Sequence, residues 1–218
     1  MMANSETLNV VIGPRRLEGL LHIPSQPSGL IIFAHGSGSS RFSPRNSFVA
    51  GELSSHGFAT LLFDLLTEEE AEDRRNVFDI PLLGGRVVEA VDWASREGSV
   101  RELPIGLFGA STGAAAALVA AADDPALVEA VVSRGGRPDL AGEALARVEA
   151  PTLLIVGGLD YEVIELNRDA LGLLRCEASL HTVPGATHLF EEPGTLEAVV
   201  EAATDWFIRH VPRSEGTG

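Results

Sequence analysis

Two kinds of apolar pattern alternate along the chain. Short continuous apolar runs are typical of strands buried on both faces of a sheet, whereas apolar residues about three or four positions apart are typical of helices. Leu83, Val87, Val91 and Ala94 have the helical spacing. The continuous runs predict strands at Leu30–Ala34, Ala59–Phe63, 105–109, Ala130–Ser133, Thr152–Val156 and Ser179–Val183.

Helical segments separate most of these strands. They are predicted at Ser47–His56, Leu82–Arg96 and 112–122, around Leu140–Arg147, at Val163–Leu174, and in a closing amphipathic helix marked by apolar residues from Leu196 to Phe207. Leu8–Ile12 and Glu18–Ile23 indicate an N-terminal hairpin. The alternation predicts an α/β fold, a mostly parallel twisted sheet with helices on both faces, an antiparallel N-terminal edge and a single domain over residues 1–218.

The segment from Leu65 to Pro81 departs from this alternation. It follows strand 59–63 and carries a charged run, residues 68–75. Ligands of α/β sheets bind at the carboxyl ends of the strands, where this segment begins, so one interpretation is a mobile flap over a site. The other interpretation, which we favour at this point, is a solvated charged excursion.

Composition narrows the class of protein. The chain has 218 residues, 45% hydrophobic and 22% charged, and 31 acidic against 16 basic residues give a net charge of −15. That charge argues against nucleic acid or an anionic membrane as partner. One cysteine, Cys176, excludes an intrachain disulfide and fits a cytoplasmic protein. Met1–Asn9 does not resemble a signal peptide, no transmembrane helix is expected, and residues 212–218 are expected to be frayed.

The segment Gly109–Gly113, with the sequence G-A-S-T-G, fits the G-x-S-x-G pattern between a predicted strand and a predicted helix. In a nucleophile elbow the serine lies on a strained turn, and a side chain at Gly109 or Gly113 would crowd the strand or the helix behind it. Ser111 would lie at a helix N-terminus, which favours a developing negative charge. The pattern therefore predicts Ser111 as a nucleophile.

A serine hydroxyl needs a base, and the base needs an orienting acid. In G-x-S-x-G hydrolases these follow in the order Ser, Asp or Glu, His. Asp160 comes just after strand 152–156, and His188 comes after strand 179–183. Because the carboxyl ends of parallel strands share one edge, we expect Ser111, Asp160 and His188 to lie together as the catalytic residues.

Other residues are less well placed for these roles. His181 falls within a strand pattern and His210 ends the last helix, while Glu162 and Asp169 lie at the start of a helix or inside it. Asp64 follows strand 59–63 and remains an alternative acid.

The loop 35–40, with the sequence H-G-S-G-S-S, follows the strand 30–34. An oxyanion hole takes one N–H from the residue after the nucleophile, here Thr112, and another from a loop such as this one. We expect Ser37 to supply the second N–H, with Gly38 as the next choice, and His35 to hold the loop by hydrogen bonds. The loop does not fit a phosphate cradle, because no G-K-[ST] follows and no third glycine completes G-x-G-x-x-G.

With these motifs in place, residues 6 to 210 resemble the α/β-hydrolase superfamily and, within it, the dienelactone hydrolase-like branch. The matching pieces are the loop 35–40, Gly109–Gly113, the G-G-L-D segment that ends at Asp160 and the G-A-T-H segment that ends at His188. The resemblance implies a Ser-His-Asp triad. Dienelactone hydrolases proper use cysteine where this chain has Ser111, which argues for a general esterase. The chain also resembles hydrolase domains fused to phosphoribosyltransferases, a partner that we do not expect in this sequence.

Many relatives carry a lid where this chain has only residues 134–151. The resemblance therefore implies an open site for short-chain esters. Gly36 and Gly38 would border the substrate. Four arginines either meet a substrate carboxylate or are ordinary surface residues: Arg41, Arg134, Arg45 and Arg137.

These observations together predict a serine hydrolase that cleaves small carboxylic esters through an acyl-enzyme, with no metal or organic cofactor. The expected partner is a small-molecule ester rather than nucleic acid or membrane, and the oligomeric state stays open. An acyltransferase, a hydrolase of thioesters, lactones or amides, and a non-catalytic binding protein on the same scaffold remain alternatives.

Overall fold

The computed structural model describes residues 5–211 and contains one sheet of eight strands. The frayed tail predicted at residues 212–218 lies outside the described residues. The strands are β1 (Glu6–Ile12), β2 (Leu17–Ile23), β3 (Gly29–Ala34), β4 (Phe58–Phe63), β5 (Ile105–Ala110), β6 (Val128–Arg134), β7 (Thr152–Gly157) and β8 (Ala178–Val183). The helices are α1 (Pro44–Ser55), α2 (Glu68–Glu72), α3 (Ile80–Ala94), α4 (Thr112–Asp123), α5 (Tyr161–Leu173) and α6 (Thr195–His210), with 3₁₀ segments η1 (Asn76–Phe78) and η2 (Pro138–Arg147).

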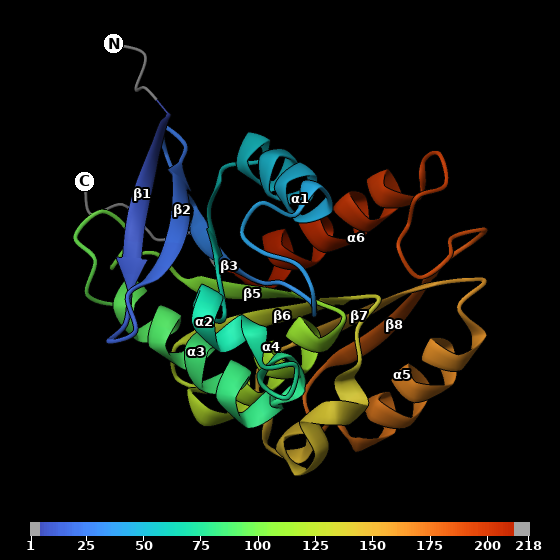
Figure 1. Cartoon of the computed structure of the whole chain (residues 1–218). Helices are drawn as coiled ribbons and strands as arrows, with labels where there is room; N and C mark the ends of the chain where they lie inside the picture. Colours follow the sequence, from blue (N-terminus) through green and yellow to red (C-terminus); the bar gives the residue numbers. More distant parts are fainter. Residues whose placement is uncertain (1–4, 212–218) are drawn as a thin grey trace.

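The strand order is β1-β2-β4-β3-β5-β6-β7-β8 (Figure 1). The pairs β1–β2 and β2–β4 are antiparallel, and every later pair is parallel. Helices α1 and α6 cover one face, while α3, α4 and α5 lie on the other (Figure 1). This is an α/β-hydrolase fold with no large cap, so the predicted fold class and its antiparallel N-terminal edge are confirmed.

The central strands divide the core in two because successive side chains on a strand point to opposite faces. From β3, Leu30 and Ile32 join a cluster with α3 and α4. Ile31 and Phe33 join a second cluster with α1 and α6, in which the rings of Phe33 and Phe108 lie 4.9 Å apart. Strands β3, β4, β5 and β7 are buried along their whole length, which explains their continuous apolar runs.

One predicted helix is wrong in type. The segment predicted as a helix around Leu140–Arg147 is a 3₁₀ stretch, η2, interrupted at Gly142, whose φ of 54° is not helical. Within residues 5–211, no helix is both long and apolar enough to cross a membrane.

Candidate active site

Ser111 lies on the sharp turn between β5 and α4. Its φ of 51° and ψ of −123° form a strained conformation for a residue with a side chain. A Cβ atom at Gly109 would lie 2.4 Å from the Cα of Ala114, and one at Gly113 would lie 2.2 Å from the backbone oxygen of Ala34. Neither contact is tolerable, so the reason predicted for both glycines is confirmed. Hydrogen bonds from the Ser111 N–H to the Arg134 oxygen (3.3 Å) and from the Arg137 N–H to the Ser111 oxygen (3.1 Å) fix the turn.

His188 and Asp160 meet at the same edge of the sheet. Asp160 follows β7, His188 follows β8, and His188 Nδ1 lies 2.7 Å from Asp160 Oδ2. The carboxylate side chain is 16% exposed and the imidazole 40% exposed. A proton on Nδ1 that is donated to Asp160 leaves Nε2 as the acceptor, which is the tautomer that a general base requires.

The main chain holds the two loops that carry Asp160 and His188. The Leu159 N–H donates to the Ala186 oxygen at 2.9 Å, and a Cβ atom at Gly157 would lie 2.5 Å from that oxygen. Glu192 accepts hydrogen bonds from the Thr187 N–H (3.1 Å) and hydroxyl (2.6 Å). The hydrogen bond from the Thr187 hydroxyl, and then that from its N–H, lowers the pKa of Glu192. The position of His188 is therefore set by backbone contacts and a carboxylate clamp.

The alternative acid and the other histidines have different partners. Asp64 accepts a hydrogen bond from the backbone N–H of Arg41 at 2.7 Å and forms an ion pair with the Arg41 side chain. His181 is exposed on β8, and His210 lies 3.5 Å from Glu177. Among these candidates, Asp160 is the carboxylate that contacts His188.

The loop 35–40 lies against the nucleophile turn. A Cβ atom at Gly36 would be 2.9 Å from the Ser111 Cβ, so only glycine allows this approach. The Ser37 N–H, predicted to serve an oxyanion, donates to the Thr112 hydroxyl at 3.0 Å. It therefore reaches a substrate carbonyl only by sharing or exchanging this bond. Gly38, the second choice, lies next to it with a φ of 69°.

His35 has the structural role that the sequence predicts. Its Nε2 accepts from the Leu65 N–H at 3.1 Å, and its Nδ1 lies 2.9 Å from the Gly36 oxygen. Burial lowers the pKa of His35 below its ordinary value of 6.5, which keeps the ring neutral and suited to these two roles.

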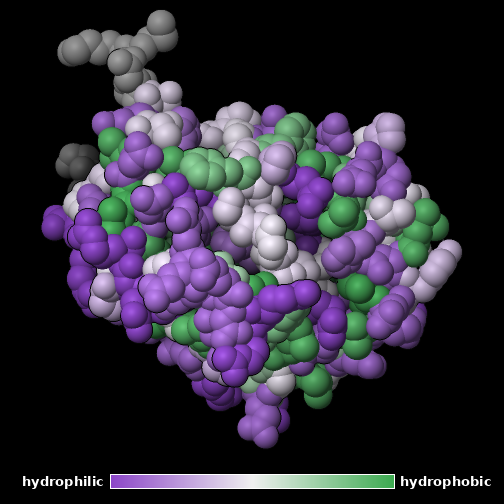
Figure 2. All heavy atoms as spheres, viewed as in Figure 1, coloured by the Kyte–Doolittle hydropathy of each residue, from purple (hydrophilic) through white to green (hydrophobic). Residues whose placement is uncertain are grey.

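A cavity of about 350 Å³ opens beside this loop, over the ends of β3 and β4. It is lined by residues 35–42 and 64–66, by Glu68 and Ala71, by Val77 and Leu83, and by Thr112. We call it the side cavity. In the view of Figure 1, the surface has a pale central band of intermediate hydropathy between purple hydrophilic residues (Figure 2).

Each of the four candidate arginines already has a polar partner within the protein. Arg41 borders the side cavity but forms ion pairs with both Asp64 and Glu18. Arg134 is 5% exposed and donates to Asn46 at 2.9 Å; burial, and then the charge of Arg45, lowers its pKa to about 10. Arg45 lies 3.4 Å from Glu191, and Arg137 is paired with Asp139 at 2.8 Å.

The outer wall of the side cavity was not predicted from the sequence. Residues 65–78 contain the short helices α2 and η1, and Leu65, Leu66, Ala71 and Val77 of this segment line the cavity, while most of the charged run 68–75 is exposed as the favoured interpretation expects. A signal was present. Thr67 and Glu70 match the capping box S/T-x-x-E, and both of its hydrogen bonds form.

Three comparisons bear on this site. The family model of the dienelactone hydrolases, "Dienelactone hydrolase family", matches residues 17–211. The crystal structure of dienelactone hydrolase from Anabaena variabilis is 52% identical with a TM-score of 0.92, covering 97% of this chain and 100% of that one. Est1E from Butyrivibrio proteoclasticus, 18% identical, shares the fold with a TM-score of 0.78 over 93% of this chain and 98% of its own.

A curated relative is longer. The Mycobacterium tuberculosis (strain CDC 1551 / Oshkosh) protein named "Putative phosphoribosyl transferase MT0597" is 58% identical over 206 residues, which are 94% of this chain and 46% of that protein. The chain therefore spans about half the length of this relative. The match of the family model over residues 17–211 places the chain in the dienelactone hydrolase family.

Proposed function

We propose that this protein hydrolyses small carboxylic esters, with Ser111 as nucleophile, His188 as general base and Asp160 as the acid that orients His188. The observation that carries the proposal is the 2.7 Å contact between His188 and Asp160 at the edge of the sheet where Ser111 occupies its strained turn. The hydrolase family supports the class of reaction, and the lack of a large cap supports small substrates.

The chemistry follows from these roles. His188 Nε2 takes the proton of Ser111 as the hydroxyl oxygen attacks the ester carbonyl, and Asp160 stabilises the imidazolium that forms. The N–H groups of Thr112 and of loop 36–38 stabilise the oxyanion. His188 then returns the proton to the departing alkoxide, and a water molecule, activated by the same base, releases the acid from Ser111.

The test uses p-nitrophenyl acetate and the variant Ser111→Ala. We expect kcat to fall by on the order of 10⁶-fold, since removing the nucleophile of a serine hydrolase costs about this much. A fluorophosphonate probe should label the unchanged protein and not the variant. Equal turnover by the two proteins would overturn the proposal, and no labelling of the unchanged protein would favour the binding-protein alternative. Added alcohol acceptors distinguish acyl transfer from hydrolysis by their ester products.

A further inference from the structure

We propose that the side cavity is the acyl pocket of this enzyme, that it takes uncharged acyl chains, and that Arg86 is the positioning residue that fixes its outer wall. This inference rests on the proposed ester hydrolysis and adds to it the substrate class and the residue that sets selectivity.

The position of the cavity assigns it to the acyl group. His188 must protonate the departing oxygen, so the leaving group lies toward β8. The acyl chain extends away from His188, toward the opposite side of Ser111. In the strand order, β3 and β4 lie on that side of β5, and the side cavity opens at their ends beside Thr112 and loop 36–38.

The lining selects an apolar chain. Leu65, Leu66, Ala71, Val77 and Leu83 contribute the apolar wall. The charged residues at the rim are Arg41, which Asp64 and Glu18 neutralise, and the carboxylate of Glu68. A carboxylate on the acyl chain would meet excess negative charge there and lose its hydration, whereas a methyl group loses nothing.

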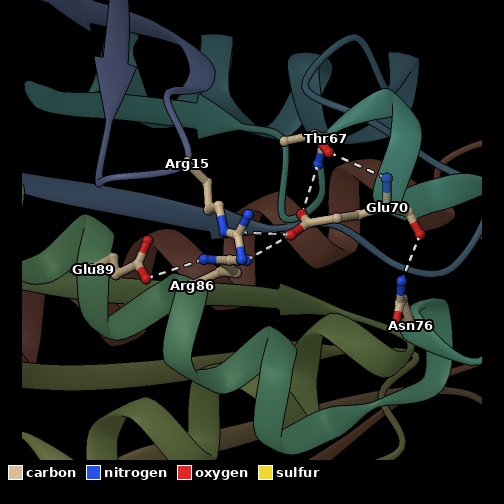
Figure 3. Close-up of polar contacts among 6 residues, drawn as sticks. All are labelled: Arg15, Thr67, Glu70, Asn76, Arg86 and Glu89. Carbon is tan, nitrogen blue, oxygen red and sulfur yellow. Dashed lines mark hydrogen bonds and ion pairs between the residues drawn. The ribbon is translucent and has the colours of Figure 1, made fainter.

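Arg86 joins the wall to the body of the protein, as Figure 3 shows. Its side chain is 7% exposed on α3 and lies 2.8 Å from Glu70 of α2 and 3.1 Å from Glu89. Arg86 lies one turn after Leu83 on α3. The helix that lines the cavity with Leu83 therefore also carries the guanidinium that binds Glu70. The exposed Arg15 adds only a 3.8 Å contact to Glu70.

Glu70 connects the Arg86 ion pair to two other parts of the wall segment, Thr67 and Asn76. Its side chain accepts from the Thr67 N–H at 3.1 Å, and its backbone oxygen accepts from the Asn76 side-chain amide at 2.8 Å (Figure 3). Ala71 and Val77, the wall residues of α2 and η1, directly follow Glu70 and Asn76. One buried guanidinium thus holds both parts of the wall, which makes the segment a fixed wall rather than a mobile flap.

The experiment measures kcat and KM for p-nitrophenyl acetate, butyrate and hexanoate. Two buried methylene groups increase binding roughly tenfold, so kcat/KM should rise about this much from acetate to butyrate in the unchanged enzyme. In Arg86→Met we expect the increase in kcat/KM from acetate to butyrate to shrink to about twofold. The cause is a higher KM for butyrate, because a loose wall no longer buries the acyl chain, while kcat for acetate changes by less than about twofold.

Arg86→Lys should restore part of the increase in kcat/KM from acetate to butyrate. Glu69→Gln, an exposed neighbour on α2, is the matched control and should change nothing.

Removing one partner of a buried ion pair is destabilising, so Tm is measured for each variant. Glu70→Gln is the milder variant, and Val77→Phe tests the cavity without touching the ion pair, since it should exclude hexanoate and spare acetate. Mono-p-nitrophenyl succinate, which has the chain length of butyrate with a terminal carboxylate, should be cleaved at least about tenfold more slowly than butyrate.

The outcomes separate the two proposals. Suppose that fluorophosphonate labels Ser111 and that p-nitrophenyl acetate is cleaved. If Arg86→Met then keeps the full increase in kcat/KM from acetate to butyrate, the acyl-pocket proposal is overturned and ester hydrolysis stands. The same holds if the succinate ester is cleaved as fast as the butyrate ester. If a lower Tm accompanies an equal loss on all three esters, Arg86 is merely structural and its positioning role is overturned. If Ser111 is neither labelled nor active, the proposed function fails first.

Discussion

The two flanks of Ser111 are built in different ways. On the β8 flank, Asp160 and His188 are held by backbone hydrogen bonds and by a glycine, Gly157, that no side chain can replace. On the β4 flank, the segment that forms the outer wall of the side cavity is joined to α3 by a side-chain ion pair, Arg86 with Glu70. The loops of the proposed catalytic residues therefore depend mainly on the main chain, with one carboxylate clamp at Glu192, whereas the wall of the proposed acyl pocket depends on side chains. Substitutions on the β8 flank should abolish turnover, and those on the β4 flank should change which ester is preferred.

The largest difference between the flanks is expected when one carboxylate on each is changed to its amide. Asp160→Asn keeps the shape but presents the wrong hydrogen-bonding group to His188, and we expect kcat for p-nitrophenyl acetate to fall by on the order of 10⁴-fold, as in other serine hydrolases. The matched variant Asp64→Asn weakens the ion pair with Arg41 and removes a charge near His35, but it leaves the Asp160–His188 contact intact and should cost less than about tenfold. Equal losses in the two variants would mean that the flanks do not differ in this way.

The second prediction concerns the turn between the flanks. Gly113→Ala places a methyl group 2.2 Å from the Ala34 oxygen, and backbone cannot yield as a flexible side chain does. We expect the free energy of unfolding, measured in urea, to fall by about 3 kcal/mol or more. Gly51→Ala on α1 is the control, because a Cβ atom there meets nothing within 4 Å. It should leave stability unchanged or raise it slightly. A stable, active Gly113→Ala protein would contradict the elbow geometry.

The same difference explains what could be predicted from the sequence. Continuous apolar runs predicted the parallel strands. The G-x-S-x-G pattern predicted the turn at Ser111, and Asp160 and His188 follow later strands, so all three were expected at one edge of the sheet. Those inferences use only local spacing and the rule that parallel strands share an edge. Their catalytic roles stay predictions until activity is measured.

The β4 flank escaped prediction because its contacts join residues distant in sequence. The residues around Arg86 in the sequence do not indicate that its guanidinium contacts Glu70, which lies sixteen positions earlier. The charged run at 68–75 is mostly exposed, and the partly buried carboxylate of Glu70 within it cannot be distinguished from its neighbours by sequence. Gly142 likewise broke a predicted helix, since helical spacing does not report a backbone with positive φ.

The third prediction tests where the flanks meet, at the hydrogen bond from the Ser37 N–H to the Thr112 hydroxyl. Thr112→Val removes the acceptor and leaves the loop less fixed, so we expect kcat to fall about tenfold with KM nearly unchanged, because an oxyanion donor acts in the transition state. Thr112→Ser keeps the hydroxyl and should stay within about twofold of the unchanged enzyme. A rise in kcat for Thr112→Val would show instead that the hydroxyl competes with the substrate for this N–H.

The smallest expected effect is a pH dependence of stability from His35, which joins the loop beside Ser111 to Leu65 on the β4 flank. Burial lowers the pKa of His35 in the folded state below the ordinary value of 6.5. Between these two values the unfolded chain binds more protons, so the free energy of unfolding falls as pH drops below 6.5 and levels off below the folded pKa.

Urea unfolding at a series of pH values checks this, with His35→Asn as the comparison. Above the ordinary pKa both proteins should have flat profiles, although the variant is less stable because it loses the bond to Leu65. Below it, the unchanged protein should lose stability more steeply, by at most about 1.4 kcal/mol per pH unit for one proton. Parallel profiles would mean that His35 binds its proton equally well in the folded and unfolded chain, which a ring that accepts from the Leu65 N–H through Nε2 does not allow. The loop beside Ser111 would then be tied to the β4 flank by something other than a neutral imidazole.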